Sequence, residues 1–257
     1  MDLLLFSDEP ETQPRHWRWS LPTEPYLTAL RTECGLEAMV ASAHTDLERV
    51  ALICHWVHGL WRHDGSNHCA QDDPLSILRE AEQGKSFACY EFAMVLAGCC
   101  TAVAMPARVL KLMTADCETR ATGAMHVVTE VWLPDHGEWI FTDAQCDVVT
   151  SLAGAPLNGV QLQRAVVEGD PRLEVGALSR ENAGEYASAI LPYLHYLCTP
   201  LDNRVGVEHR CRRDLCLVPL GSSAPKVFQR KYPLASEFTR SVRAFYPMLE
   251  SRQGGLP

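Results

Sequence analysis

Apolar residues between positions 45 and 61 recur at steps of three and four, which places them on one face of a helix. Thr45 and Glu48 form a capping-box pattern, so we expect this helix to begin after Thr45 and to continue to about Trp61. A second short helix is predicted over 73–84, where an aspartate precedes a proline in the first turn. A third is predicted from residue 86 to just before the proline at position 106.

The spacing of apolar residues changes after the third helix. Segments 107–113, 126–133 and 139–144 are rich in β-branched and aromatic residues and predict strands. The sequence PDHGE between the last two is typical of a hairpin turn. Helices followed by antiparallel strands predict an α+β fold, with helices packed on an antiparallel sheet.

The C-terminal part of the chain mixes both patterns. Helices are predicted over 157–166, 181–197 and 235–246, and extended segments over 215–220 and 226–233. No internal repeat interrupts this order. We therefore expect one compact unit, in which residues 1–156 form a core with a helical lead-in. Residues 157–257 would be an extension packed on the core, covering or lining a cleft.

Composition narrows the classes of function. The chain has 257 residues, 47% of them hydrophobic, enough to bury a large core. The formal net charge of -9 argues against a nucleic-acid partner. The start MDLLLFSDEP lacks the features of a signal peptide, and no apolar run approaches the ~18 residues of a membrane span. With 11 irregularly spaced cysteines, we expect free, mostly buried thiols and a cytoplasmic protein without membrane contact.

The stretch CHWVHGLWRHDGSNHC, from Cys54 to Cys69, concentrates residue types that bind zinc. However, His55 and His58 are three residues apart on the first helix and point about 60° apart. No ordered zinc spacing such as HExxH is present. We expect no metal here, with the stretch flanking the site; a zinc hydrolase built on these histidines remains the alternative.

The segment GKSFACYEFAMVLAG places Cys89 in the first turn of the third predicted helix. At this position the unpaired backbone N–H groups and the helix dipole favour a thiolate. The same N–H groups can stabilise the oxyanion that forms when a thiolate attacks an acyl carbon. Burial as an inert core thiol is the commoner fate of a cysteine, so this interpretation requires partners.

Two partners lie on the predicted hairpin. If the hairpin loop has four residues, Asp143 lies opposite Val128, and His126 is its diagonal neighbour on the same face, ~7–8 Å away. A five-residue loop would turn Asp143 away from His126. The pattern permits a nucleophile–His–Asp triad of Cys89, His126 and Asp143 without requiring it. Asp147 is an alternative third member.

The helix-starting cysteine, the AMPARV segment, the strand-opening histidine and the WIFTD strand together resemble the transglutaminase-like superfamily of papain-like cysteine enzymes. The resemblance covers about residues 50–150. It implies that Cys89 is the nucleophile, that His126 is the general base and acid, and that Asp143 orients the imidazole. Residues 106–108 would begin the first strand of the core sheet.

The chain departs from the family pattern after its histidine, where Val127-Val128 stand in place of a small residue and a tryptophan. The resemblance also implies a second oxyanion donor on an element before the nucleophile. Trp61 is the candidate for this role, and Asn67 and His68 are alternatives. Trp61 also fits the apolar face of its own helix, where it would be a core residue.

These features predict acyl-enzyme chemistry on an amide, peptide, ester or thioester carbonyl, without a cofactor. Hydrolysis is the first expectation. Amide-forming acyl transfer in a small-molecule pathway is the alternative, with an acyl carrier or an amine acceptor as a further partner. A non-catalytic binding protein on the same fold is a third hypothesis, which the presence of all three triad residue types disfavours.

Overall fold

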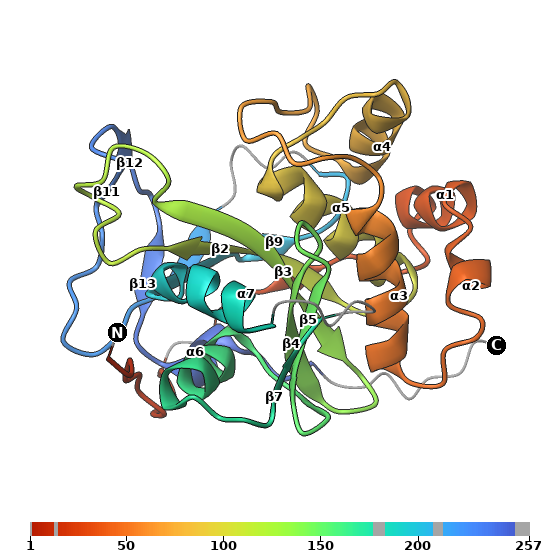
Figure 1. The fold of residues 1–257 in the computed structure, drawn as a ribbon. Coiled ribbons are helices and arrows are strands. Elements are labelled where there is room, and N and C mark those ends of the chain that lie inside the picture. The colour runs from red at the N-terminus through yellow and green to blue at the C-terminus, as the bar shows by residue number, and fades with distance from the viewer. Residues whose placement is uncertain (1, 13–14, 177–182, 208–212, 250–257) are drawn as a thin grey trace.

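The computed structural model describes residues 2–12, 15–176, 183–207 and 213–249. Five helices form its N-terminal part: α1 (Pro25–Glu33), α2 (Leu36–Met39), α3 (Asp46–His58), α4 (Pro74–Glu82) and α5 (Cys89–Ala102). They gather on one side of the central strands (Figure 1). The long helix α5 packs directly against the strands β2 (Ala107–Met113) and β3 (Met125–Leu133).

Local signals begin α3 and α4 where the sequence predicts. The Thr45 hydroxyl accepts a hydrogen bond from the Glu48 backbone N–H at 3.1 Å, completing the capping box of α3. The Asp73 carboxylate caps α4 in the same way. Helix α3 ends at His58, three residues before the predicted end, and α5 begins at Cys89 instead of residue 86.

The helices cover a mostly antiparallel sheet. In the described part of the chain its strand order is β13-β10-β8-β2-β3-β4-β5-β6, with β7 paired to β5, and only β10 and β13 run parallel. The strands besides β2 and β3 are β4 (Glu138–Asp143), β5 (Val148–Leu152), β6 (Ala155–Pro156), β7 (Leu173–Val175), β8 (Tyr196–Pro200), β10 (Asp214–Leu217) and β13 (Glu237–Thr239). The predicted α+β fold is confirmed.

Two short ladders lie outside the sheet. Strand β1 (Arg18–Trp19) pairs with β9 (Asp202–Asn203), and β11 (Val227–Phe228) forms a small hairpin with β12 (Tyr232–Pro233). The second ladder agrees with the extended segment predicted over 226–233.

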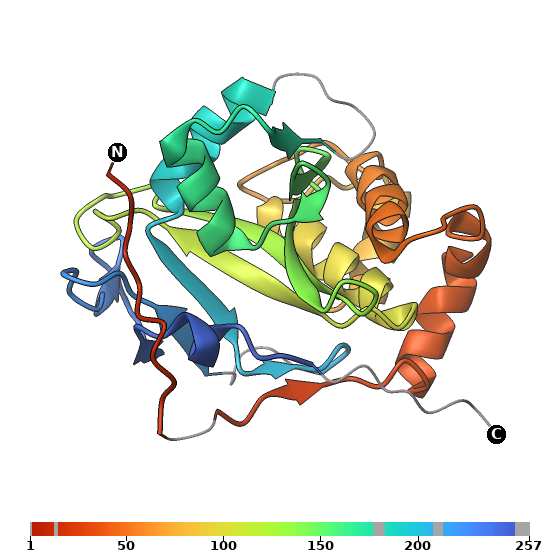
Figure 2. The same ribbon diagram turned by 90° about the horizontal axis from the view of Figure 1, so that it is seen from below.

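The sheet buries both of its faces. Val109, Val127 and Val131 belong to the core beneath the N-terminal helices. Leu110 and Val128 alternate with them and belong to a second core, which lies under α6 (Gly159–Glu168) and the helices α7 (Ala183–Ile190) and α8 (Val242–Phe245). Figure 2 shows this arrangement, with α6 and α7 on the other side of the sheet from α3. Strand alternation thus produces two cores from one sheet.

A buried ion pair joins the C-terminal segment to the sheet. Glu130 Oε2 accepts hydrogen bonds from Arg108 Nε at 3.0 Å and Nη2 at 2.7 Å, and both side chains are fully buried. The other carboxylate oxygen accepts from the Tyr246 hydroxyl at 2.8 Å and the Gly159 N–H at 2.9 Å. The guanidinium also lies 4.5 Å from the centroid of the Trp139 ring. Every oxygen of this carboxylate is therefore used.

Two C-terminal predictions are wrong. The helix predicted over 181–197 ends early within the described residues: α7 stops at Ile190, a 3₁₀ turn spans Leu191–Tyr193, and β8 begins at Tyr196. Proline in the turn and pairing of β8 with both β2 and β10 outweigh the helical pattern. The last predicted helix, 235–246, is divided into strand β13 and the single turn α8, because Glu237–Thr239 pair with β10.

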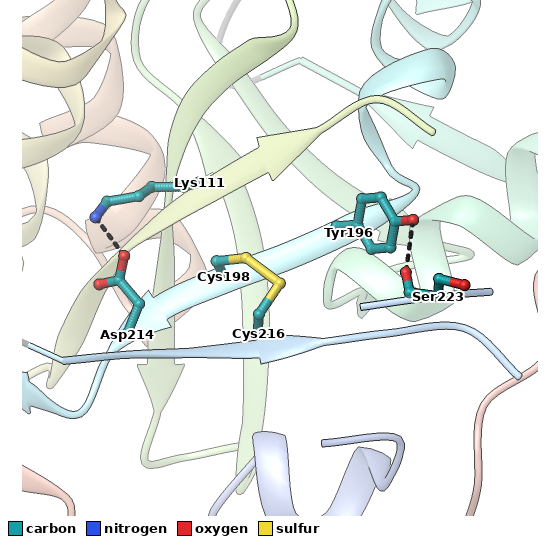
Figure 3. The surroundings of a disulfide bond; sticks show 6 residues. All are labelled: Lys111, Tyr196, Cys198, Asp214, Cys216 and Ser223. Carbon is teal, nitrogen blue, oxygen red and sulfur yellow. Dashed lines mark hydrogen bonds and ion pairs between the residues drawn. A yellow bond between two sulfur atoms is a disulfide. The ribbon is translucent and has the colours of Figure 1, made fainter. Parts of the chain in front are cut away.

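The expectation of free thiols also needs a correction. Cys198 and Cys216 are opposite each other on β8 and β10 and form a disulfide (Figure 3). Eight other described cysteines are free, and Cys211 lies outside the described residues. A cross-strand register with the two Cα atoms 4.0 Å apart brings the two sulfurs within bonding distance. Among the described residues, no helix is both long and apolar enough to cross a membrane.

Candidate functional site

Cys89 is the first residue of α5. The preceding Ala88 is extended and provides no side-chain cap, so no side chain of the N-cap residue occupies the first N–H groups of the helix. A loop holds this entry in place: the Phe87 carbonyl accepts from the Asp64 N–H at 2.8 Å, and the Ala88 N–H donates to the Asn67 carbonyl at 3.3 Å. The partly buried thiol lines a cleft of about 730 Å³.

The hairpin of β3 and β4 has the register that a triad needs. Leu133 pairs with Glu138, so the loop has four residues, and Thr129 pairs with Thr142. The register therefore places Asp143 opposite Val128. His126 Nε2 lies 2.7 Å from Asp143 Oδ2, and the carboxylate is 1% exposed. Of the two loop lengths that the sequence allows, the structure has the one that brings this pair together.

The same imidazole bridges Asp143 and the thiol. With Nε2 bound to Asp143, the other ring nitrogen is available to Cys89, with which His126 shares a hydrogen bond. Burial alone would lower the pKa of His126. The charge of Asp143 and its hydrogen bond, with a smaller contribution from Cys89, outweigh burial and raise the pKa of His126 to about 10. The surroundings thus favour the protonated form of the His126 imidazole.

Three donors surround the Asp143 carboxylate besides His126. The Gln145 backbone N–H donates to Oδ1 at 3.0 Å, and the Tyr186 hydroxyl of α7 donates to Oδ2 at 3.0 Å. The Cys146 thiol also forms a hydrogen bond with the carboxylate. Desolvation and then the charge of Asp143 raise the pKa of this thiol. Cys146 therefore stands beside Cys89 in the cleft as a weakly acidic second thiol.

The three oxyanion candidates lie in different surroundings. Trp61 is 9% exposed and packs between Phe87 and Phe92, and its Nε1–H is buried with no hydrogen-bond partner among the described residues. The side chain of Asn67 donates to the Ser86 carbonyl at 2.6 Å and so supports the loop before the nucleophile. His68 lines the cleft itself. Of the three, only this histidine is among the residues that border the cavity.

The His-rich stretch supports the loop that follows Asp143. His58 Nδ1 lies 3.2 Å from the Ala144 carbonyl and 3.1 Å from that of Gln145. His55 Nδ1 lies 2.8 Å from Oδ2 of the buried Asp147, the alternative third triad residue. The carboxylate that meets His126 is thus Asp143, while Asp147 meets a different histidine.

The remaining histidines of the stretch reach the cleft. His63 and His68 both line it, and His68 Nδ1 is held 3.0 Å from Oε1 of the buried Glu91. In the part of the chain that the structure describes, no three His, Cys, Asp or Glu side chains gather as metal ligands. The stretch thus contributes His63 and His68 to the lining of the cleft, and His58 contacts the loop that follows Asp143.

Side chains of the C-terminal extension complete the wall of the cleft opposite the nucleophile helix. They come from α7, from the 3₁₀ turn and from the β11–β12 hairpin: Tyr186, Ala189, Ile190, Tyr193, Phe228 and Gln229. The ring centroid of Tyr193 lies 6.1 Å from that of His126. Lys111 is the cation of the cleft lining, and its ammonium is paired with Asp214 at 2.7 Å (Figure 3). Nothing in the sequence pattern singles out Tyr186, because one tyrosine in a predicted helix carries no distinguishing signal.

Comparisons with known proteins agree with the order of the motifs. Residues 36–144 match the family model described as the transglutaminase-like superfamily. None of the curated proteins matches the sequence. The matched segment contains the helix of Cys89 and the hairpin of His126 and Asp143.

Two solved structures are similar to part of the chain. One is a candidate cysteine protease from Cytophaga hutchinsonii, with 17% identity and a TM-score of 0.38 over 46% of this chain and 37% of that one. The other is a candidate protease from Parabacteroides distasonis, with 14% identity and a TM-score of 0.32 over 48% of this chain and 27% of that one. The chain therefore spans well under half the length of either protein. The match over residues 36–144 agrees with the resemblance to the transglutaminase-like superfamily that the sequence motifs predict.

Proposed function

We propose that the protein is a cysteine hydrolase that cleaves a peptide or amide bond through an acyl-enzyme. One observation carries the proposal: Cys89 and His126 interact and line the same cleft, and His126 Nε2 lies 2.7 Å from the buried Asp143 carboxylate. A helix N-terminus supplies the nucleophile and, with its N–H groups, a place for an oxyanion. The cleft volume of about 730 Å³ suits a small molecule or a short peptide segment.

The geometry supports a balanced two-step reaction. Cys89 Sγ attacks the carbonyl carbon, and as the tetrahedral intermediate collapses the C–N bond breaks and His126 gives its proton to the departing amine. Water then attacks the thioester while His126 accepts a proton from it, the C–S bond breaks and the acid is released. Asp143 holds the imidazole in the orientation that both steps require and stabilises its charge.

Acyl transfer to an amine is a second candidate, and one feature of the cleft favours it. The wall beside His126 is apolar and aromatic, with Ile190, Tyr193 and Phe228 among its residues. An amine with an apolar group held there would be placed to attack the thioester in competition with water. Products formed with and without an added arylalkylamine distinguish the two reactions by mass spectrometry.

The proposal is tested first without a substrate, by the rate at which iodoacetamide labels each cysteine as pH is varied. We expect Cys89 to react fastest at about pH 6, and this excess to disappear in His126→Ala, because the imidazolium stabilises the thiolate. Burial raises the pKa values of Cys69 and Cys117 to about 11, so these thiols serve as slow internal controls.

Cys34 is the more demanding control. A hydrogen bond with Cys99 lowers the pKa of Cys34, so this thiol is also expected to react at moderate pH. Its rate should not change in His126→Ala, since its partner is elsewhere. If Cys89 reacts no faster than Cys69 and does not respond to the loss of His126, the proposed triad is wrong and a non-catalytic binding role is favoured.

A further inference from the structure

The helix α7 lies outside residues 36–144, which match the transglutaminase-like family, yet it reaches the third member of the triad. The Tyr186 hydroxyl donates to Asp143 Oδ2 at 3.0 Å. This is the same oxygen that lies 2.7 Å from His126 Nε2. The side chain of Tyr186 also borders the cleft. A residue of the C-terminal extension therefore contacts the catalytic hydrogen-bond line directly.

The contact has a mechanical consequence for Asp143. A carboxylate can rotate about its terminal bond. Its hydrogen bond with His126 therefore stays aligned only if other donors hold the carboxylate oxygens in place. The Gln145 N–H donates to Oδ1 at 3.0 Å, and the Tyr186 hydroxyl donates to Oδ2 at 3.0 Å, so each oxygen has a donor besides His126. Without the hydroxyl, the carboxylate would lose one of the donors that hold it in place for His126 and would keep the Gln145 N–H and the Cys146 thiol.

The donor is present over the whole working range of pH. Burial and then the charge of Asp143 raise the pKa of Tyr186 well above its ordinary value, so the hydroxyl stays protonated. The titratable groups that face this hydroxyl and carboxylate come from several elements: Cys54 of α3, Cys89 of α5, His126 of β3, and Cys146. Of these, His126 binds Asp143 at the oxygen that Tyr186 shares.

We propose that Tyr186 is a positioning residue, which holds the Asp143 carboxylate in the orientation that binds His126. The inference rests on the proposed role of the triad and assigns a task to the C-terminal extension. The triad would then be complete only when α7 is docked on the sheet. Tyr186 itself takes no part in bond making.

The test compares Tyr186→Phe with Tyr232→Phe, which removes the hydroxyl of an exposed tyrosine outside the cleft lining and keeps its ring. The readout is the rate of iodoacetamide labelling of Cys89 in the full chain at about pH 6 and about pH 9.5. We expect Tyr186→Phe to slow labelling about tenfold at the lower pH, the size of effect of a lost hydrogen bond to a charged group. At the higher pH, where a thiolate forms without help, its rate should stay within about twofold of the wild type. Tyr232→Phe should stay within about twofold of the wild type at both pH values.

Two results would overturn the inference. One is that iodoacetamide labels Cys89 rapidly in the wild type, in a way that depends on His126, and equally rapidly in Tyr186→Phe. Asp143 would then be held in place without the hydroxyl. If labelling changes at both pH values and the buried Cys54 and Cys100 become reactive, Tyr186 acts on the fold instead. Failure of the proposed function looks different, since Cys89 would then be slow in the wild type itself.

Discussion

Replacing Asp143 by asparagine should change the titration of His126 more than any other single substitution near the site. The side chain keeps its size, but it loses the charge that lies 2.7 Å from His126 Nε2. Burial lowers the pKa of His126, and Asp143 is the main cause that raises it, to about 10. Without that charge we expect the pKa of His126 to fall to its ordinary value of about 6.5 or below.

The size of the effect follows from this shift. The difference between an ordinary histidine at 6.5 and His126 at about 10 corresponds to about 5 kcal/mol in favour of the protonated imidazole. The side chain is 15% exposed, so solvent screens the pair little. Because the folded state binds the proton more tightly, this contribution to the free energy of unfolding is complete below about pH 6.5. It is lost as pH rises from there through about 10.

Two measurements follow the change. An NMR titration of the His126 imidazole, assigned with the His126→Ala spectrum, gives its pKa directly in the wild type and in Asp143→Asn. Urea unfolding at several pH values should show the wild type losing stability above about pH 6.5 relative to Asp143→Asn.

Asp135→Asn provides the matched control for both measurements. It removes an aspartate that pairs with His136 at 2.6 Å in the exposed turn of the same hairpin, and it should leave His126 unchanged. A pKa of His126 that is equally high in Asp143→Asn would refute the assignment of the shift to this carboxylate.

Two further predictions concern stability. Glu130→Gln should lower the free energy of unfolding by about 3–5 kcal/mol, because it leaves the Arg108 charge buried without its partner. Glu33→Gln breaks an exposed ion pair and is the control, so it should change the free energy of unfolding little. Equal losses in the two variants would contradict the prediction. Replacing both Cys198 and Cys216 by alanine should cost about 3 kcal/mol in urea unfolding, from the 18-residue separation that the disulfide closes. Peptide maps without reductant should show the two cysteines linked, and free alkylation of both would exclude the bond.

The parts of the site that the sequence predicts well depend on local interactions. A capping box begins α3, an aspartate caps α4, and a four-residue turn determines the register of β3 and β4. The turn length decides whether Asp143 meets His126, because one added residue would reverse the face of every later side chain. The sequence allows both lengths, so the pair could be proposed from it but not established.

Predictions fail where long-range pairing outweighs the local pattern. Tyr196 and Leu197 continue an apolar helical pattern, but they pair with β2, more than eighty residues earlier in the chain. That pairing buries Leu197 completely in the second core. The helix predicted over 181–197 would not by itself supply the neighbours that bury this side chain. Strand preference of this kind depends on the neighbours that a strand finds, so the segment itself cannot reveal it.

The same reasoning applies to the places of Trp61 and Tyr186 in the structure. Trp61 stands close to the nucleophile in the chain, but Phe87 and Phe92 form a slot for its ring, and packing there directs the indole away from the cleft lining. Tyr186 lies almost a hundred residues after Cys89 and outside the segment that matches the family, yet it contacts Asp143. Its place depends on how α7 docks against the sheet, and docking is decided by the second core, in which Ile190 is buried with Leu110, Val128 and Phe141. The strands that carry His126 and Asp143 thus also form the surface on which α7 docks, so the packing that positions Asp143 also brings a hydroxyl to it.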